Sequence, residues 1–108
     1  MTATVTVDRE GIVIGWNEET VGLLGYPESH AVGRAMDFFI PEEYRDMHWE
    51  GFRGAMASGT LKFAPTDILP VEMTHHNGTR LPIDVTVLPL RDAAGRIISL
   101  TATLKLRM

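Results

Sequence analysis

The chain has 108 residues, a formal net charge of -4 at pH 7 and no cysteine, which suits one hydrophobic core and one domain over residues 1–108. The negative charge and the scattered basic residues argue against nucleic acid or a membrane surface as a partner, and the lack of cysteine excludes disulfides, thiolate ligands and cysteinyl adducts. No run reaches the roughly 18 apolar residues of a membrane span and no signal sequence is evident, so a cytoplasmic location is the default expectation.

The first quarter of the chain predicts a hairpin followed by a short helix. Residues 4–7 and 12–16 are β-rich and flank residues 8–11, which end in a glycine that suits a turn. Asn17 is a predicted N-cap, and Gly25 is the predicted end of a helix of about two turns. The apolar residues expected on its buried side are Val21 and Leu24.

A longer helix is predicted to start after Ile40-Pro41 and to end at Ser58-Gly59. Residues three, four, seven and eight positions apart share a helix face. One mostly apolar stripe therefore contains Tyr44, His48, Gly51, Phe52, Ala55 and Met56.

Three strands are predicted in the last third of the chain. The first covers residues 68–74, and the Asn77-Gly78 pair that follows it is a strong hairpin signal. Alternating apolar residues mark the other two. They are Leu81, Ile83, Val85 and Val87 in one strand, and Ile98, Leu100, Ala102, Leu104 and Leu106 in the other. These elements predict an α+β fold, with helices on one face of a five-stranded antiparallel sheet.

His48 is the residue of greatest functional interest, because an imidazole on an apolar stripe needs a partner. Gly51 and Ala55, one and two turns further on, leave space in which a flat ligand can lie against the ring. This combination suggests a metal-centred macrocycle. The simpler alternative is a buried histidine that forms a hydrogen bond with a neighbouring residue.

In its motif order the sequence resembles a PAS domain from about residue 5 to residue 104. The markers are residues 8–13, Trp16-Asn17, residues 24–26, Gly33-Arg34 and residues 77–79. Residues 40–52 are similar to the haem-binding PAS domains of bacterial gas sensors, in which the helix histidine is the proximal ligand to iron. The resemblance implies haem b as cofactor and His48 as its iron ligand.

Several further residues follow from that resemblance. Val85, Val87, Leu100 and Ala102 are expected on the opposite wall of the haem pocket, and Lys62 and Arg53 are candidates to pair with the haem carboxylates. The arginine that oxygen sensors aim at bound oxygen is missing, since the corresponding residues read Ile68-Leu69-Pro70. CO or NO is therefore favoured over O2 as the diatomic gas ligand, with redox state as a further signal. Met73 is a minor candidate for a sixth iron ligand.

Other functions stay open at this point. Glu72 and Asp84 lack a nucleophile, a phosphate loop or a zinc constellation beside them, so enzyme activity is not expected. His75-His76 is expected at a solvated hairpin tip and not in a metal site. One rival function is a PAS dimerisation and interaction module without haem, and another is a PAS domain that binds flavin or another small molecule. A homodimer is expected through a sheet face that carries Leu88 and Leu90, and the signalling output domain or partner is expected outside this chain.

Overall fold

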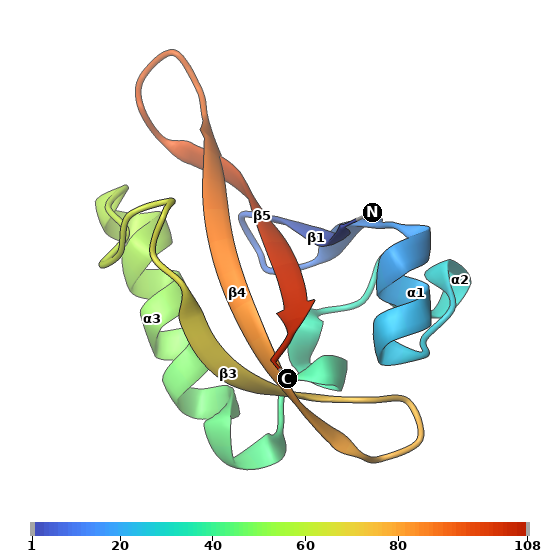
Figure 1. Cartoon of the computed structure of the whole chain (residues 1–108). Helices are drawn as coiled ribbons and strands as arrows, with labels where there is room; N and C mark the ends of the chain where they lie inside the picture. The colour runs from blue at the N-terminus through green and yellow to red at the C-terminus, as the bar shows by residue number, and fades with distance from the viewer. Residues whose placement is uncertain (1, 108) are drawn as a thin grey trace.

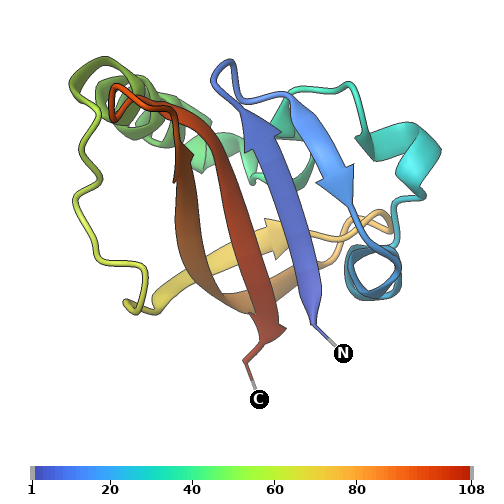
Figure 2. The same ribbon diagram turned by 90° about the horizontal axis from the view of Figure 1, so that it is seen from above.

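The computed structural model describes residues 2–107, which form one antiparallel sheet of five strands in the order β2-β1-β5-β4-β3. Figures 1 and 2 show the helices on one face of this curved sheet, as the sequence predicted. The strands are β1 (Ala3–Asp8), β2 (Val13–Trp16), β3 (Leu69–Thr74), β4 (Arg80–Arg91) and β5 (Ile97–Leu106).

The helical layer lies between β2 and β3 in the chain. It consists of α1 (Glu18–Leu24), α2 (Glu28–Ala31), the 3-10 turns η1 (Met36–Phe39) and η2 (Glu42–Tyr44), and α3 (Arg45–Ser58). The predicted caps of α1 are confirmed: the Asn17 side chain accepts from the Thr20 amide, and Gly25 ends the helix at φ 84°. Leu24 is buried and Val21 is half-buried against the core, as predicted. The sequence did not indicate Thr20, which is fully buried and donates its hydroxyl to the Thr4 carbonyl over 2.8 Å.

The predicted alternation in β4 and β5 is largely confirmed, and it decides which side chains face the helices. Ile83, Val85 and Leu104 are buried, and Val87 and Leu100 pack against the same core. Two positions differ. Leu106 is 37% exposed where the sheet ends, and Ile98 is 39% exposed because the register passes from Leu90↔Ser99 to Arg91↔Ile97 and leaves Ile98 in a bulge. The bulge turns Ile97 into the core in its place.

An aromatic cluster fills the space between the sheet and the helices at the α1 end. The Trp16 indole donates to the Tyr26 carbonyl over 2.9 Å, and the rings of Phe38 and Phe39 lie 5.5 Å and 5.8 Å from the Trp16 ring. Trp16, Tyr26 and Phe39 are buried. This end of the core is therefore filled by the protein's own side chains.

Among residues 2–107, no helix has both the length and the apolar character needed to cross a bilayer.

Candidate functional site

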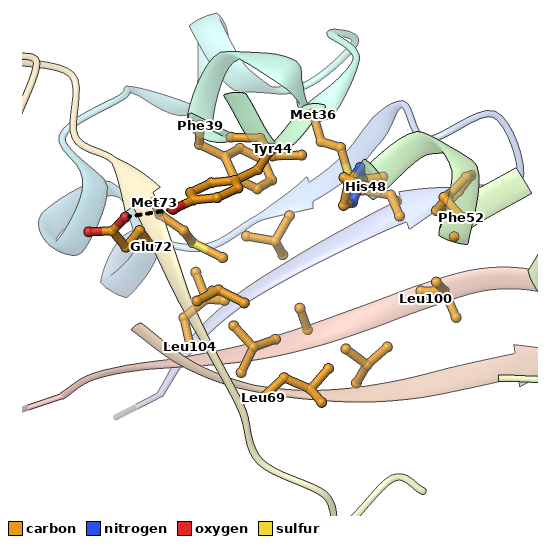
Figure 3. Close-up of a pocket in the computed structure, with 18 of the residues that line it drawn as sticks. Met36, Phe39, Tyr44, His48, Phe52, Leu69, Glu72, Met73, Leu100 and Leu104 are labelled. Carbon is orange, nitrogen blue, oxygen red and sulfur yellow. Dashed lines mark hydrogen bonds between the residues drawn. The ribbon is translucent and has the colours of Figure 1, made fainter. Parts of the chain in front are cut away.

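A cavity of about 680 Å³ lies between α3 and the inner face of the sheet. Figure 3 shows that it receives side chains from the helical layer on one side and from the strands on the other. Its wall is mostly apolar, and only four of its described side chains are polar: Tyr44, His48, Glu72 and Arg107. The volume falls within the range of about 300–1,000 Å³ that cofactor and ligand pockets span.

The helix α3 forms one wall of the cavity because of how it begins and ends. Pro41 starts η2 and has no amide proton to leave unpaired at a helix start, and η2 continues directly into α3. Gly59 ends α3 in the left-handed region at φ 73°, with its amide bonded to the Ala55 carbonyl. These boundaries agree with the predicted ones and place His48 in the first half of α3.

His48 extends from α3 into the cavity, with Phe52 one turn further along the same helix (Figure 3). The two rings are nearly parallel, with centroids 6.2 Å apart and an interplanar angle of 23°. The Nδ1 atom of His48 is buried and has no hydrogen-bond partner among the described residues. A buried polar atom without a hydrogen bond lowers the stability of the fold by about 1–3 kcal/mol. A bound ligand that contacts Nδ1 would remove this cost.

The surroundings of His48 favour a neutral imidazole. Desolvation by burial lowers the pKa of His48, and the Asp37 carboxylate opposes this shift. A neutral imidazole has one nitrogen with a free lone pair, which is the form that ligates a metal. The electrostatics of the site therefore suit ligation better than acid catalysis.

Most of the residues predicted for the pocket line this cavity. Those that do are Tyr44, His48, Gly51, Phe52, Val85, Val87, Leu100 and Ala102. Gly51 is an exposed residue that also lines the cavity, and a Cβ built there meets no heavy atom within 4 Å. Met73, the minor candidate for an iron ligand, also lines the cavity and is 8% exposed. Their common location supports the prediction of one shared pocket and does not test what it binds.

Four predicted residues lie outside the cavity: Arg53, Ala55, Met56 and Lys62. Ala55 is seven residues beyond His48, about 10 Å along the helix axis, and does not line the cavity. Met56 is buried but lies beside a separate surface depression with Trp49 and Arg53. Lys62 is exposed in the link after α3 and does not line either pocket. Helical periodicity identified the correct face, but it carried no information on where the cavity ends.

A polar network that was not predicted from the sequence lies at one end of the cavity. The Tyr44 hydroxyl lies 3.5 Å from Oε1 of Glu72 (Figure 3), and Arg80 bridges Glu72 at 3.7 Å and Glu43 at 2.6 Å. Arg107 donates to Asp84 over 2.9 Å. Glu72 therefore forms an ion pair with Arg80, and Asp84 forms one with Arg107. Acidic and basic residues alternate along β3 and β4 in the order Glu72, Arg80, Asp84, and this order could have indicated ion pairs between the two strands. Arg107 follows the last strand, so strand periodicity could not place it.

The residues present fit a haem. Such a group needs an apolar pocket, an axial ligand and room beside that ligand; the cavity wall, the unpaired His48 imidazole and the cavity volume beside it meet these needs. The described residues contain no cluster of three His, Cys, Asp or Glu that could hold a free metal ion. A haem needs only one such ligand from the protein, so that finding does not bear on haem.

A flavin fits the same wall less well. The polar edge of a flavin ring has several hydrogen-bonding atoms that need partners when buried. The chain has no glutamine and two asparagines, Asn17 and Asn77, and neither asparagine lines the cavity. The apolar wall therefore favours a cofactor with an apolar centre.

The expected hairpin tip is present, with His76 exposed and His75 half-buried. These residues lie in the β3–β4 turn, but both rings make contacts: His75 packs against Gly25 and His76 against Tyr26. The His76 amide also donates to the Leu24 carbonyl over 2.8 Å. The tip of the turn is therefore exposed to solvent while its base packs on the α1 end of the molecule.

Comparison with known proteins identifies the fold. A PAS domain from Colwellia psychrerythraea superposes with a TM-score of 0.81 at 17% identity, covering 98% of this chain and 86% of that one. A light-oxygen-voltage domain studied with a flavin analogue gives 0.77 at 16% identity, with coverage of 100% and 78%. The PAS domain of an HTR-like protein from Haloarcula marismortui gives 0.71 at 17% identity, with coverage of 98% and 81%. At these identities the likeness shows the fold alone.

No curated protein matches the chain at a significant level. The family described as PAS fold matches residues 2–106. That match covers nearly the whole chain and agrees with the sheet and helices described above. The chain belongs to the PAS family.

Proposed function

We propose that this PAS module binds haem b in the cavity under α3, with His48 as the axial ligand, and acts as a sensor of a diatomic gas or of redox state. The observation that carries this proposal is the buried, unpaired Nδ1 of His48 in the wall of an apolar cavity. When bound, a haem supplies an iron atom that takes a gas ligand or changes oxidation state. The haem-sensor resemblance of residues 40–52 supports the same assignment.

Different side chains of the cavity would ligate the haem, pack against it and pair with its carboxylates. His48 supplies the nitrogen ligand, and Phe52 packs beside it and limits rotation of the imidazole. Val85, Val87 and Leu100 form the apolar wall that keeps water out. Among the residues that the structure describes, Arg107 is the one arginine or lysine in the wall, and it replaces Lys62 and Arg53 as the candidate partner for a ligand carboxylate.

The apolar wall favours CO or NO over O2. A bound O2 gains more than CO does from a hydrogen-bond donor in the pocket, and the strand stretch at Leu69 and Pro70 offers no polar side chain. Affinities for CO and O2 measured on the reconstituted protein test this preference. Tight O2 binding would contradict it.

Signal output is proposed to leave through the outer face of the sheet. Val87 faces the cavity, so its neighbours Leu88 and Leu90 point to the opposite face, where they are 62% and 58% exposed. Exposed leucines on a sheet face are typical of an association surface. We propose a homodimer or an output domain as the partner, and sedimentation of the Leu88→Glu/Leu90→Glu variant tests the homodimer. A monomeric wild-type protein would exclude it and leave the output domain.

The test of the haem proposal is an absorbance titration of the purified protein with hemin. We expect a saturable Soret band at one haem per chain, and in His48→Ala a shifted band with affinity lower by at least about tenfold. The double variant His75→Ala/His76→Ala is the matched control, because it removes two histidines outside the cavity, and it should bind as the wild type does.

The other outcomes separate the rival functions. A flavin released from the purified protein would support a flavin-binding PAS domain. A colourless protein that does not take up hemin would support an interaction module without cofactor. The cytoplasmic location and the lack of enzyme activity stay predictions from the sequence.

A further inference from the structure

Two histidines from distant parts of the chain meet outside the cavity. His30 lies in α2 and His76 lies in the β3–β4 turn, and their ring centroids are 5.6 Å apart with an interplanar angle of 70°. Figures 1 and 2 both place this turn beside α1 at the end away from α3. The sequence separation of the two residues explains why no spacing motif indicates the pair.

The segments that carry the two rings are held in place by other contacts. The Tyr26 hydroxyl lies 2.9 Å from the Thr74 carbonyl and 3.0 Å from the Phe38 carbonyl. The Tyr26 ring stacks on His30 at 5.3 Å and meets His76 edge-on at 4.8 Å. Gly25 has φ 84°, and a Cβ there would lie 2.5 Å from the His75 ring, so the turn packs tightly on α1. The two imidazoles therefore meet without a further change in the backbone.

The ring separation matches the geometry of two imidazoles on one metal ion. With metal–nitrogen bonds of about 2.0–2.1 Å and about 1.1 Å from nitrogen to ring centre, a tetrahedral ion separates the two centroids by roughly 5 Å. The observed centroid separation of 5.6 Å is close to this value. His76 is exposed and His30 half-buried, so water can occupy the remaining coordination positions.

We propose that His30 and His76 together bind one divalent transition-metal ion of the class that prefers imidazole nitrogen. The described residues place no third His, Cys, Asp or Glu in the group, so the site uses two protein ligands. A site of two neutral imidazoles selects Ni²⁺, Cu²⁺ or Zn²⁺ over Mg²⁺ and Ca²⁺, which prefer oxygen ligands. The site is independent of the haem proposal.

The charges around the pair set the pH range of binding. Desolvation lowers the pKa of His30, and the positive charges of Arg34 and of protonated His76 act in the same direction. Tyr26 is the other titratable group against the two rings, and burial raises its pKa. Metal binding needs a neutral imidazole, so the lowered pKa of His30 keeps this ligand available to a lower pH than an ordinary histidine would be.

The test uses untagged, chelator-treated protein titrated calorimetrically with Ni²⁺ and with Zn²⁺ at pH 7.5. We expect one ion per chain and a melting temperature that rises by several degrees in excess metal. His30→Ala and His76→Ala should each lower the affinity at least about tenfold. His75→Asn is the control, because it removes the adjacent imidazole but keeps a side chain that can accept a hydrogen bond from the Asn77 amide, and it should keep most of the affinity.

The His48→Ala variant keeps this test separate from the haem proposal, since it should bind Ni²⁺ as the wild type does. Absence of binding to the wild-type protein at millimolar metal would overturn the two-histidine site. Loss of affinity in only one of the two variants, or an equal loss in His75→Asn, would also overturn it. None of these results depends on whether the protein takes up hemin.

Discussion

The two ends of the space between the helices and the sheet are built differently. At the α1 end, Trp16, Tyr26 and Phe39 fill the space, and the Trp16 indole and Tyr26 hydroxyl have hydrogen-bond partners. Under α3, the same sheet faces a cavity of about 680 Å³, and the His48 imidazole keeps an unpaired buried nitrogen. The filled end stabilises the fold through close packing. The hollow end contributes less stability, because it has fewer packing contacts and one unsatisfied polar atom.

The difference in packing between the two ends indicates the candidate site better than their residue content does. Both ends are rich in apolar residues, and both contain histidine. Among the described residues, only those at the α3 end combine free volume with an unsatisfied polar atom, a combination typical of ligand sites. Matched substitutions at the two ends should therefore have different effects.

The largest difference is expected between two leucine truncations. Leu24→Ala removes a fully buried side chain at the filled end and should lower the free energy of unfolding by about 2–5 kcal/mol. Leu100→Ala removes a side chain that already borders the cavity, so it loses fewer contacts and should cost less than half as much. Urea denaturation of both variants measures the two costs. Equal costs would contradict the contrast between the two ends.

Two alanine enlargements should differ in the opposite sense. Ala31 is fully buried, so Ala31→Leu overpacks the filled end and should cost about 1–3 kcal/mol. Ala102 borders the cavity, and Ala102→Leu should leave the stability of the cofactor-free protein within about 1 kcal/mol of the wild type.

The same Ala102→Leu variant also tests the ligand site. The added side chain occupies the cavity, so the affinity for hemin should fall at least about tenfold, as judged by absorbance titration. Unchanged hemin affinity would place the haem outside this cavity.

The pH dependence of stability should report the desolvated imidazole. The pKa of folded His48 is lowered, mainly by burial, so below about pH 6.5 the unfolded chain binds more protons than the folded one. Stability is therefore complete above that pH and falls as the pH falls through the lowered folded-state value. Denaturation from pH 8 to pH 5 should show a shallower fall for His48→Leu. His30 also has a lowered pKa but is present in both proteins, and identical slopes would refute the role of His48.

The smallest effect is expected at the polar end of the cavity. Arg80 and Glu43 pair through two 2.6 Å contacts, but their side chains are 44% and 50% exposed. Exposed ion pairs contribute about 0–1 kcal/mol, so Arg80→Gln should change stability by no more than this, and less at 1 M salt. A larger effect measured by denaturation would indicate that this pair holds η2 and the start of α3 against the sheet.

Local sequence patterns predicted much of the fold. The Asn17 cap, the end of α3 at Gly59 and the alternation of Val85 and Val87 depend on short-range chemistry and were correct. The exposed Ile98 was not predicted, because a bulge depends on how two strands pair and not on the strand itself.

The site was predicted in outline but not in extent. His48 and Phe52 line the cavity because helical spacing fixes a face, whereas Ala55 and Lys62 lie outside it because spacing does not fix its length. Arg107 and the His30–His76 contact depend on tertiary packing between segments far apart in sequence. No pattern within one element carries that information.

The most direct test of the haem assignment is a crystal structure of the hemin-reconstituted protein with anomalous data collected at the iron edge. We predict one iron peak per chain inside the cavity, at coordination distance from an imidazole nitrogen of His48. An iron peak beside another histidine, or a His48 ring turned away from iron and bonded to protein, would contradict the account.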